Sequence, residues 1–432
     1  MKRPIAFLLA VVLIAGLVGC GKKNIEEDSE ANDEQENAEP KTAVELTLEK
    51  AGGYIYGVCW PTEYYKRLKD VGLGWVRFDI PYPYDTNGNL RAEYTAFKKK
   101  AKGYTDNKIK VMAITPYPKD FVNIGGFDPI DSANIQRTQE IAVFLINDLR
   151  NVVAGIQISN ELDHPTHKKP FTTLEQAVKF IGIQAEALNA VKGDLIVGYN
   201  TCSLNKNMNT LMKPYLPYMD YVGVDLYYGT WAKGKLDNYI QDLRTLYQAV
   251  NKPILLAEFG YASKGSPTAE DCAAILAGYG YDSEAAARAD IVKLVEKLPD
   301  QFKALIKNNY PDTADWGNAV FVTYGNHFYG CNKLASSNPI TDIDLTEPDI
   351  SHSEEGQAEF FRQLIPLLKQ QPYLIGFFIY CWSDRSVCGT CGLERCPNET
   401  SWGLVTAQDI KKPSYHAVKE AIEACKATDA AE

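Results

Sequence analysis

Apolar residues gather in eight short runs along the chain, each bounded by polar or turn-forming residues. The runs are nearly continuous and rich in β-branched and aromatic residues, a pattern typical of strands that are covered on both faces. We therefore expect eight buried strands. They are predicted at residues 54–60, 73–82, 109–117, 153–161, 194–201, 219–228, 253–261 and 374–382.

Between these runs, apolar residues recur at the helical period. The clearest stretch spans residues 174–191, and Thr173 with Gln176 gives it the signature of a capping box. Strand–helix alternation repeated eight times predicts an α/β fold of the (β/α)8, or TIM-barrel, type. A doubly wound open sheet is the alternative, but the first strand is not followed by the Gly-rich fingerprint of that class. Further helices are predicted at 236–250, 355–370 and 413–425.

The barrel is expected to form a single domain, residues 46–432, with a long insertion between strands seven and eight. A typical barrel needs about 250 residues, and much of the surplus falls in residues 262–352. This stretch contains a predicted helix near 284–308 and an aromatic loop at 321–330. We interpret it as an elaborated loop over the barrel mouth and not as a separate domain.

The first residues have the features of an export signal. Two basic residues precede an apolar stretch that ends in Leu-Val-Gly-Cys at residues 17–20, which resembles the bacterial lipobox. We expect residues 1–20 to be a lipoprotein signal peptide, with lipid on Cys20 holding the protein on the cell surface or the periplasmic face. An ordinary secretory signal with a chance cysteine is the alternative. Residues 21–45 are expected to be an acidic, disordered tether, because 24–40 contain eight acids and no base.

Charge and cysteine content limit the partners. The formal net charge of −10 argues against a nucleic-acid partner, and nothing in the sequence calls for a cofactor or an oligomer. Cysteines other than Cys20 are odd in number, and three of them, Cys388, Cys391 and Cys396, lie in one loop. Three thiolates at this spacing suit zinc, but no His is near, so we favour disulfides within the loop or to Cys331.

Barrel enzymes keep their chemistry at the carboxyl ends of the strands. Two carboxylates and several aromatic residues at one rim suggest glycoside cleavage, which needs one carboxylic acid, one carboxylate and apolar surfaces for sugar rings. The strand-end residues expected to act or to bind substrate are Trp60, Arg77, Tyr117, Asn160, Glu161, Asn200, Tyr227, Tyr228, Glu258 and Trp382; Asp79 and Asp225 also stand there.

Strand parity assigns the roles of the two glutamates. Ile254, Leu256 and Glu258 share a face by the period of two. If that face points inward, Arg77 of strand two lies close to Glu258 and keeps it ionised, as a nucleophile requires. The charge on Glu258 would then raise the pKa of Glu161 and keep it protonated, as an acid requires.

Residues 54–425 resemble the clan of retaining (β/α)8 glycoside hydrolases that includes cellulases, mannanases and β-galactanases. The resemblance is carried by Asn160–Glu161 in "QISNELD", Glu258 in "ILLAEFGYAS" and Arg77 in "WVRFDIPY". It implies that Glu161 is the acid/base, that Glu258 is the nucleophile, and that Asn160 binds the sugar 2-hydroxyl group.

The same resemblance extends to the aromatic residues. It implies that Tyr227 or Tyr228 bonds the nucleophile and that Trp382 forms the floor of the sugar site. Only one of two adjacent tyrosines can face the site, and we favour Tyr228. The tail "SWGLVTAQDIKKPSYHAVK", residues 401–419, also looks like the ending of clan members.

Two features depart from the clan pattern. Strand six carries Asp225 where many members have His, and Asp163, His164 and His167 follow the acid/base. These three could bind a metal, but we favour a role for His164 in lining the leaving-group side and expect no metal.

The sequence therefore predicts a surface-tethered retaining β-glycosidase that acts on a poly- or oligosaccharide. A non-catalytic glycan-binding lipoprotein on the same barrel is the main alternative. A metal-dependent hydrolase is a third hypothesis.

Overall fold

The structure is a computed structural model that describes residues 40–230, 232, 234–264, 269–323, 350–387 and 400–429. The predictions for the signal peptide, for Cys20, and for Cys331, Cys388, Cys391 and Cys396 lie outside these residues. Among the helices described, none is both long and apolar enough to cross a membrane.

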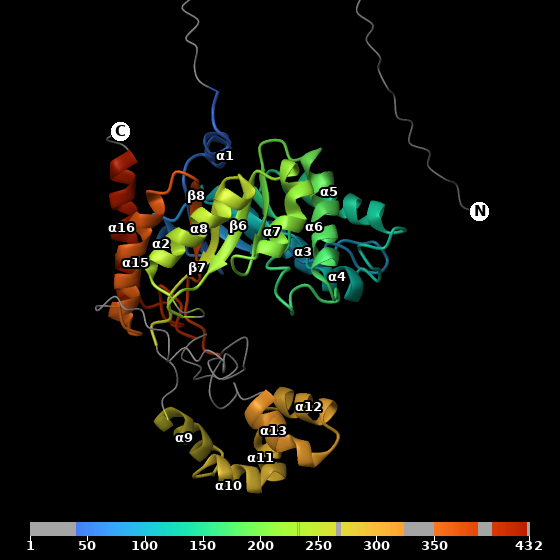
Figure 1. Cartoon of the computed structure of the whole chain (residues 1–432), viewed down its shortest axis with the longest axis vertical. Helices are drawn as coiled ribbons and strands as arrows, with labels where there is room; N and C mark the ends of the chain where they lie inside the picture. Colours follow the sequence, from blue (N-terminus) through green and yellow to red (C-terminus); the bar gives the residue numbers. More distant parts are fainter. Residues whose placement is uncertain are drawn as a thin grey trace, which may run out of the picture. The chain divides into compact units, whose positions relative to one another are not determined.

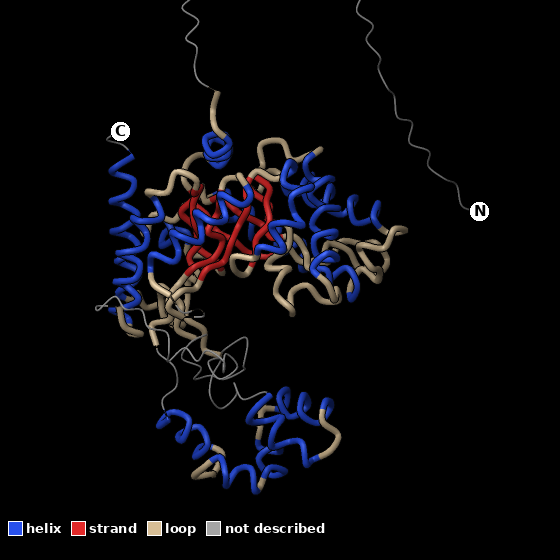
Figure 2. The backbone as a smooth tube through the Cα atoms, in the orientation of Figure 1, coloured by secondary structure: helices blue, strands red, loops and turns tan. Residues whose placement is uncertain are grey.

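Eight parallel strands form a closed barrel in sequence order, which confirms the predicted TIM-barrel fold. Figures 1 and 2 show these strands at the centre, with helices around them. Each strand lies within its predicted run. The strands are β1 (Ile55–Cys59), β2 (Trp75–Asp79), β3 (Lys110–Ile114), β4 (Gly155–Gln157), β5 (Ile196–Thr201), β6 (Tyr221–Leu226), β7 (Ile254–Phe259) and β8 (Leu374–Ile379).

The helices that follow the strands bury their apolar faces against the barrel. The predicted capping box is present: the Thr173 hydroxyl accepts from the Gln176 backbone N–H, and the Gln176 side chain accepts from Thr173 N–H. The helices are α2 (Tyr65–Asp70), α3 (Ala92–Asp106), α4 (Pro118–Asn123), α5 (Ile135–Leu149), α6 (Leu174–Asn189), α7 (Lys206–Met212), η1 (Lys213–Tyr218), α8 (Leu236–Val250), α15 (Glu354–Lys369) and α16 (Pro413–Asp429).

The barrel has one core inside and another between strands and helices. Trp75, Tyr221 and Phe378 fill the inside, and glycines make room for their rings. A Cβ on Gly57 would come within 2.3 Å of the Phe378 ring, and one on Gly198 within 2.7 Å of the Tyr221 ring. The interior is therefore packed and closed, and ligands can reach only its ends.

Helix α1 (Ala43–Ala51) belongs to this barrel. It begins with a capping box between Thr42 and Glu45, Ala51 joins the inner core, and the Thr47 hydroxyl donates to the backbone carbonyl of Asp220. Residues 43–45, which the sequence pattern assigned to the tether, are therefore helical. A Thr-x-x-Glu signature outweighs the acidic composition that precedes it.

The insertion between β7 and β8 contains several short helices in place of the single helix expected near 284–308. The expected helix is interrupted at Asp290 and Pro299. Each of these residues stands at the N-cap position of a new helix. Residues of the insertion, including Leu294, Ile306 and Trp316, form a hydrophobic cluster of their own. The helices are α9 (Ala269–Gly278), α10 (Glu284–Ala289), α11 (Ile291–Lys297), α12 (Asp300–Asn309), η2 (Thr313–Asp315), α13 (Trp316–Asn318) and η3 (Ala319–Thr323). Most of the predicted aromatic loop lies outside the described residues.

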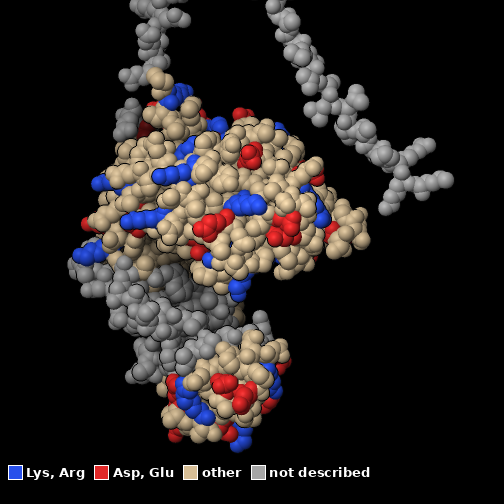
Figure 3. Space-filling model, turned by 45° about the vertical axis from the view of Figure 1, so that its right-hand side comes forward, with Lys and Arg blue, Asp and Glu red and all other residues tan. Residues whose placement is uncertain are grey.

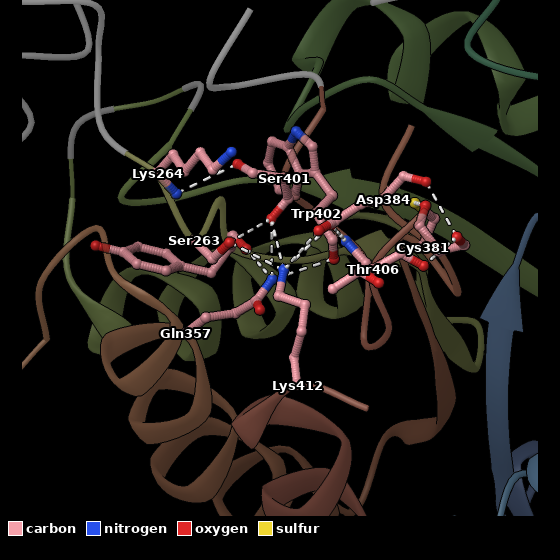
Figure 4. A network of polar contacts seen from close by, with 12 residues as sticks. Ser263, Lys264, Gln357, Cys381, Asp384, Ser401, Trp402, Thr406 and Lys412 are labelled. Atoms are coloured by element: carbon pink, nitrogen blue, oxygen red, sulfur yellow. Dashed lines mark hydrogen bonds and ion pairs between the residues drawn. The ribbon is translucent and has the colours of Figure 1, made fainter. Parts of the chain in front are cut away.

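A buried lysine ties the loops after β7 and β8 to helix α16. Lys412 Nζ lies 3.1 Å from Asp384 Oδ1 and donates to Ser263 Oγ at 2.9 Å and to the Ser401 carbonyl at 3.3 Å. Figure 4 shows its ammonium group at the centre of this network. Since Ser263 comes just before the insertion and Ser401 follows another long loop, one side chain holds the ends of both loops.

Candidate active site

Arg77 is the centre of a buried polar network at the carboxyl ends of the strands. Its Nη1 donates to Glu258 Oε1 at 2.6 Å, Nη2 to Asn160 Oδ1 at 2.5 Å, and Nε to Gln157 Oε1 at 2.9 Å. The guanidinium is buried, so its charge acts on Glu258 with little screening. The predicted closeness of Arg77 and Glu258 is thus confirmed.

Glu258 reaches the interior by a route that strand parity does not predict. Ile254 and Leu256, expected on the inward face, belong to the outer core, whereas Leu255 and Ala257 belong to the inner one. The ladder between β6 and β7 shifts register just before Glu258. This bulge moves the next side chain to the other face, so Glu258 points to Arg77 although the parity argument was wrong.

Two residues with left-handed backbone shape the turn after β4 that carries Asn160 and Glu161. Ser159 has φ of 54° and Glu161 φ of 48°. Non-glycine residues adopt this region at a cost of roughly 1–2 kcal/mol, and such strain is concentrated at functional sites. The turn is held because Ser159 N–H donates to Thr115 Oγ1 and its hydroxyl donates to the Pro116 carbonyl.

Amide side chains connect the two glutamates to Asp225. Asn200 Oδ1 accepts from Glu161 N–H at 2.9 Å, and Asn200 Nδ2 donates to Asn160 Oδ1 and Asp225 Oδ2 at 2.9 and 2.7 Å. Gln157 Nε2 donates to the same two amide oxygens at 3.1 and 2.9 Å. Asn160 and Asn200 are therefore fixed in one orientation, which rigid positioning of a substrate requires.

Of the adjacent tyrosines, Tyr227 faces the site, and the preference for Tyr228 was wrong. The Tyr227 hydroxyl donates to Glu258 Oε2 at 2.5 Å, whereas the Tyr228 hydroxyl donates to Asp242 of α8 at 2.5 Å. Trp402, from the predicted tail motif, packs edge-on against Tyr227 with ring centroids 5.2 Å apart.

Trp382 does not occupy the predicted place in the sugar site. It is only 2% exposed, belongs to the core between strands and helices, and packs on Tyr415 of α16. Tyr380, two residues earlier, is partly exposed, and its ring lies 6.1 Å from that of Tyr227. The aromatic surface next to the nucleophile is therefore Tyr380.

Trp60 and Tyr117 stand where predicted. Both line a small cavity with Arg77, Asn160 and Glu258. Trp60 is 51% exposed, and the Tyr117 hydroxyl donates to Asp79 at 3.4 Å. An exposed indole and a partly buried phenol beside two carboxyl groups form a surface suited to the C–H face of a sugar ring.

Three buried carboxyl groups share this site with one guanidinium. Burial raises the pKa of Asp225, and the charges of Glu258 and Glu161 raise it further. Burial also raises the pKa of Glu258, although Arg77 and Tyr227 partly offset this. We expect Asp225 to carry a proton and Glu258, with its two charge-stabilising donors, to be the ionised member.

Glu161 is influenced by the loop that follows it. His167 Nδ1 lies 3.1 Å from Glu161 Oε2 without a hydrogen bond of good geometry, and the contact is an ion pair when the imidazole is protonated. Burial alone would raise the pKa of Glu161, but His167 and a hydrogen bond with Asp225 outweigh it and lower the pKa. The expectation that the charge on Glu258 raises the pKa of Glu161 and keeps it protonated is therefore wrong, because the effect of His167 on this pKa is larger.

The other residues of this loop do not form a ligand set. Asp163 accepts from Cys202 N–H and Asn205 Nδ2, and His164 Nδ1 pairs with the Thr166 hydroxyl. Nowhere in the described ranges do three His, Cys, Asp or Glu side chains converge as metal ligands. The His164 ring lies 4.9 Å from the His167 ring, tilted by 49°, and is therefore one ring away from Glu161.

Sequence reasoning missed Gln157, Tyr380 and Trp402 as parts of this site. It considered His167 only as a metal ligand or as part of the leaving-group side, and it gave Asp225 no role. The departure of strand six from the clan pattern was a signal for Asp225. Gln157 comes two residues after Gly155 in the fourth run and therefore shares a face of the strand with it, which was a signal for Gln157. The roles of the other three depend on loops whose course the pattern does not predict.

No protein-family model matches the sequence, and no curated protein is significantly similar to it. Solved structures are similar in fold. The GH53 catalytic domain of Ignisphaera aggregans is 16% identical with a TM-score of 0.50, over 88% of this chain and 93% of that one.

Two further solved structures are a GH2 β-galacturonidase from Eisenbergiella tayi, 14% identical with a TM-score of 0.48, and an exo-β-1,4-mannosidase from Opitutaceae bacterium strain TAV5, 14% identical with a TM-score of 0.49. The alignments cover 86% of this chain in both cases, but only 51% and 59% of the other chains. At this identity, the likeness to the GH53 domain shows the (β/α)8 barrel fold alone.

Proposed function

We propose that this protein is a retaining β-glycosidase, with Glu258 as nucleophile and Glu161 as acid/base. The observation that carries the proposal is the geometry around Glu258: one carboxylate oxygen accepts from Arg77 and the other from Tyr227. Charge-assisted hydrogen bonds favour the ionised form, and a carboxylate fixed on both oxygens is oriented for attack on an anomeric carbon. The known activities of structural neighbours agree with this reaction class but do not establish it here.

The proposed reaction is a double displacement. Glu258 attacks the anomeric carbon and forms a glycosyl ester, while Glu161 gives a proton to the leaving oxygen. Water then attacks, Glu161 takes its proton, and the ester breaks. Asn160, held by Arg77 and Asn200, immediately precedes Glu161 in the chain and would bind the 2-hydroxyl group.

The acid proton is supplied by a carboxyl pair in this chain. Asp225 has a raised pKa and lies close enough to Glu161 for each carboxyl group to act on the pKa of the other, so a proton held by Asp225 can pass to Glu161. Asp225→Asn should then slow cleavage of poor leaving groups much more than that of dinitrophenyl glycosides, which need little protonation. Equal losses on both substrate types would contradict a role in proton supply.

The test of the whole proposal is a panel of aryl β-glycosides with the wild type and two variants. Glu258→Ala should lose activity, and azide should restore it with inverted product. Glu161→Ala should keep turnover only on activated substrates, and azide should give retained product. A Glu258→Ala enzyme with full rate contradicts the assignment. A wild type that binds glycans without cleaving any would favour the non-catalytic alternative.

We also propose that the chain is anchored by lipid on Cys20, so that the barrel acts at a membrane surface. Support comes from the basic, apolar and Leu-x-Gly-Cys segments of residues 1–20. Labelling of the expressed protein with a clickable fatty acid tests this. The wild type should be labelled and Cys20→Ser should not, whereas equal labelling of both would refute the anchor.

A further inference from the structure

A groove of about 590 Å³ lies between helix α4 and the loop after Glu161. Three lysines line it: Lys119 from α4, and Lys168 and Lys169 from the loop. No acidic side chain is among the described residues that form its wall. The groove is therefore positively charged, in a chain whose net charge is −10.

The groove borders the acid/base. Lys119 Nζ lies 5.3 Å from the centroid of the Tyr117 ring, and that ring packs against His167 at 5.8 Å. His167 in turn contacts Glu161. Tyr117 and His167 thus stand between the catalytic carboxyl groups and the lysines of the groove. Because Glu161 protonates the leaving group, the groove lies on the leaving-group side.

Within the described part of the chain, none of the three ammonium groups forms an ion pair with a carboxylate, although Lys119 is near enough to Asp120 to act on its pKa. Other lysines of the barrel do have partners: Lys98 pairs with Asp148, and Lys192 with Asp220. Bringing like charges together costs free energy unless an anion offsets the repulsion. An arrangement of this kind beside an active site favours a negatively charged ligand.

We propose that this groove binds anionic groups of the substrate beyond the cleaved bond, so that the substrate is an acidic glycan carrying carboxylate or sulfate groups. This inference rests on the proposed function. Phe171, Pro165 and Pro170 add apolar surface to the groove, which suits the C–H faces of sugar rings. Lysines act as flexible point charges and not as bidentate forks, so the groove selects for charge more than for the geometry of one acid group.

The test measures binding, so that it does not depend on turnover. Lys119, Lys168 and Lys169 are changed together to Gln in a Glu258→Gln background. Calorimetry then follows binding of oligosaccharides from polygalacturonate, alginate and a sulfated glycan, with neutral galactan and mannan oligosaccharides for comparison. The matched control changes three exposed lysines on helices α2, α3 and α6, Lys66, Lys99 and Lys179, to Gln.

The parent should bind at least one acidic oligosaccharide more tightly than neutral ones, and less tightly as salt is raised. The groove variant should lose about tenfold or more in affinity for it, since each exposed charge pair is weak alone, and the control variant should lose under about twofold. Unchanged affinity in the groove variant, or preference of the parent for neutral oligosaccharides, overturns the proposal.

Two outcomes separate this inference from others. If acidic glycans bind through the lysines but no glycan is cleaved by the wild type, the proposed function fails and the groove stands. If the lysines instead govern binding to vesicles of anionic lipid, with no effect on any glycan, the groove faces a membrane and the proposal is overturned.

Discussion

At the residue scale, the site depends on which of two adjacent tyrosines faces inward. Tyr227 donates to Glu258, while Tyr228 is directed to Asp242 on the helix after β6. The two hydroxyls therefore have different tasks, one at the nucleophile and one in anchoring α8. Trp402 supports the Tyr227 ring, so a residue of the tail contributes to the position of the nucleophile.

Tyr227→Phe and Tyr228→Phe should separate these tasks. Loss of a hydrogen bond to a charged group costs about 1.5–3 kcal/mol, so Tyr227→Phe should lower kcat/KM by about 10- to 100-fold. Tyr228→Phe should leave kcat/KM nearly unchanged and lower thermal stability slightly. Steady-state kinetics on an aryl glycoside checks both, and equal kinetic losses in the two variants would refute the assignment.

His167 sets the pH range in which Glu161 keeps its proton. The contact with His167 lowers the pKa of Glu161, and the acid step needs the protonated form of Glu161. Removing the imidazole should therefore raise the pKa of Glu161 and move the basic limb of the kcat/KM profile to higher pH. His167→Gln tests this, with His164→Gln as the neighbouring control. A basic limb that stays in place or moves to lower pH would contradict the contact.

The sequence was sufficient to predict that Glu161, Glu258 and Arg77 lie together at one rim, because the carboxyl ends of parallel strands meet there. It could not predict the bulge before Glu258 or the left-handed turn at Ser159, since both are set by pairing with other strands. The effect of His167 on Glu161 also depends on the course of a loop.

At the element scale, the alternation of apolar runs with stretches of helical period was enough to predict the barrel, because each element must bury one face against the next. The insertion was harder to predict. Its helices are short, and their boundaries at Asp290 and Pro299 depend on local breaks within one amphipathic pattern. The first residues of helix α1, 43–45, were assigned to the tether because composition was given more weight than the capping box.

Lys412 should be essential for holding the loops around the site. Its side chain is 1% exposed and pairs with Asp384, so Lys412→Met leaves a carboxylate without its partner. Breaking a buried pair costs about 3–5 kcal/mol. The neighbouring pair of Lys411 and Asp70 is exposed, and Lys411→Met should cost under about 1 kcal/mol. Denaturant unfolding compares the two, and similar losses would show that the network does not stabilise the fold.

At the scale of the whole molecule, the barrel and the insertion have separate hydrophobic clusters. The ends of the insertion are held close to the barrel: Ile350 belongs to the barrel core, and His352 stacks on Tyr261 with ring centroids 4.6 Å apart. The barrel should therefore fold without residues 265–349.

Replacing residues 265–349 with a short Gly/Ser linker tests this separation. The shortened chain should remain a cooperatively folded monomeric barrel with turnover of small aryl glycosides, because none of the described residues of the deleted segment, 269–323, belongs to the catalytic network. Its rate on polymers should change if the insertion limits access to the site. Circular dichroism melting and aryl-glycoside kinetics are the measurements. An unfolded product would show that the two cores depend on each other.

The central claim is that Glu258 forms a covalent bond with the sugar. The most direct measurement is mass spectrometry of the wild type after incubation with a panel of activated 2-deoxy-2-fluoro β-glycosides, which slow breakdown of the glycosyl ester. We predict one added sugar per chain, on the peptide that contains Glu258. An adduct on another residue, or no adduct with a reagent whose parent glycoside the enzyme hydrolyses, would contradict the claim.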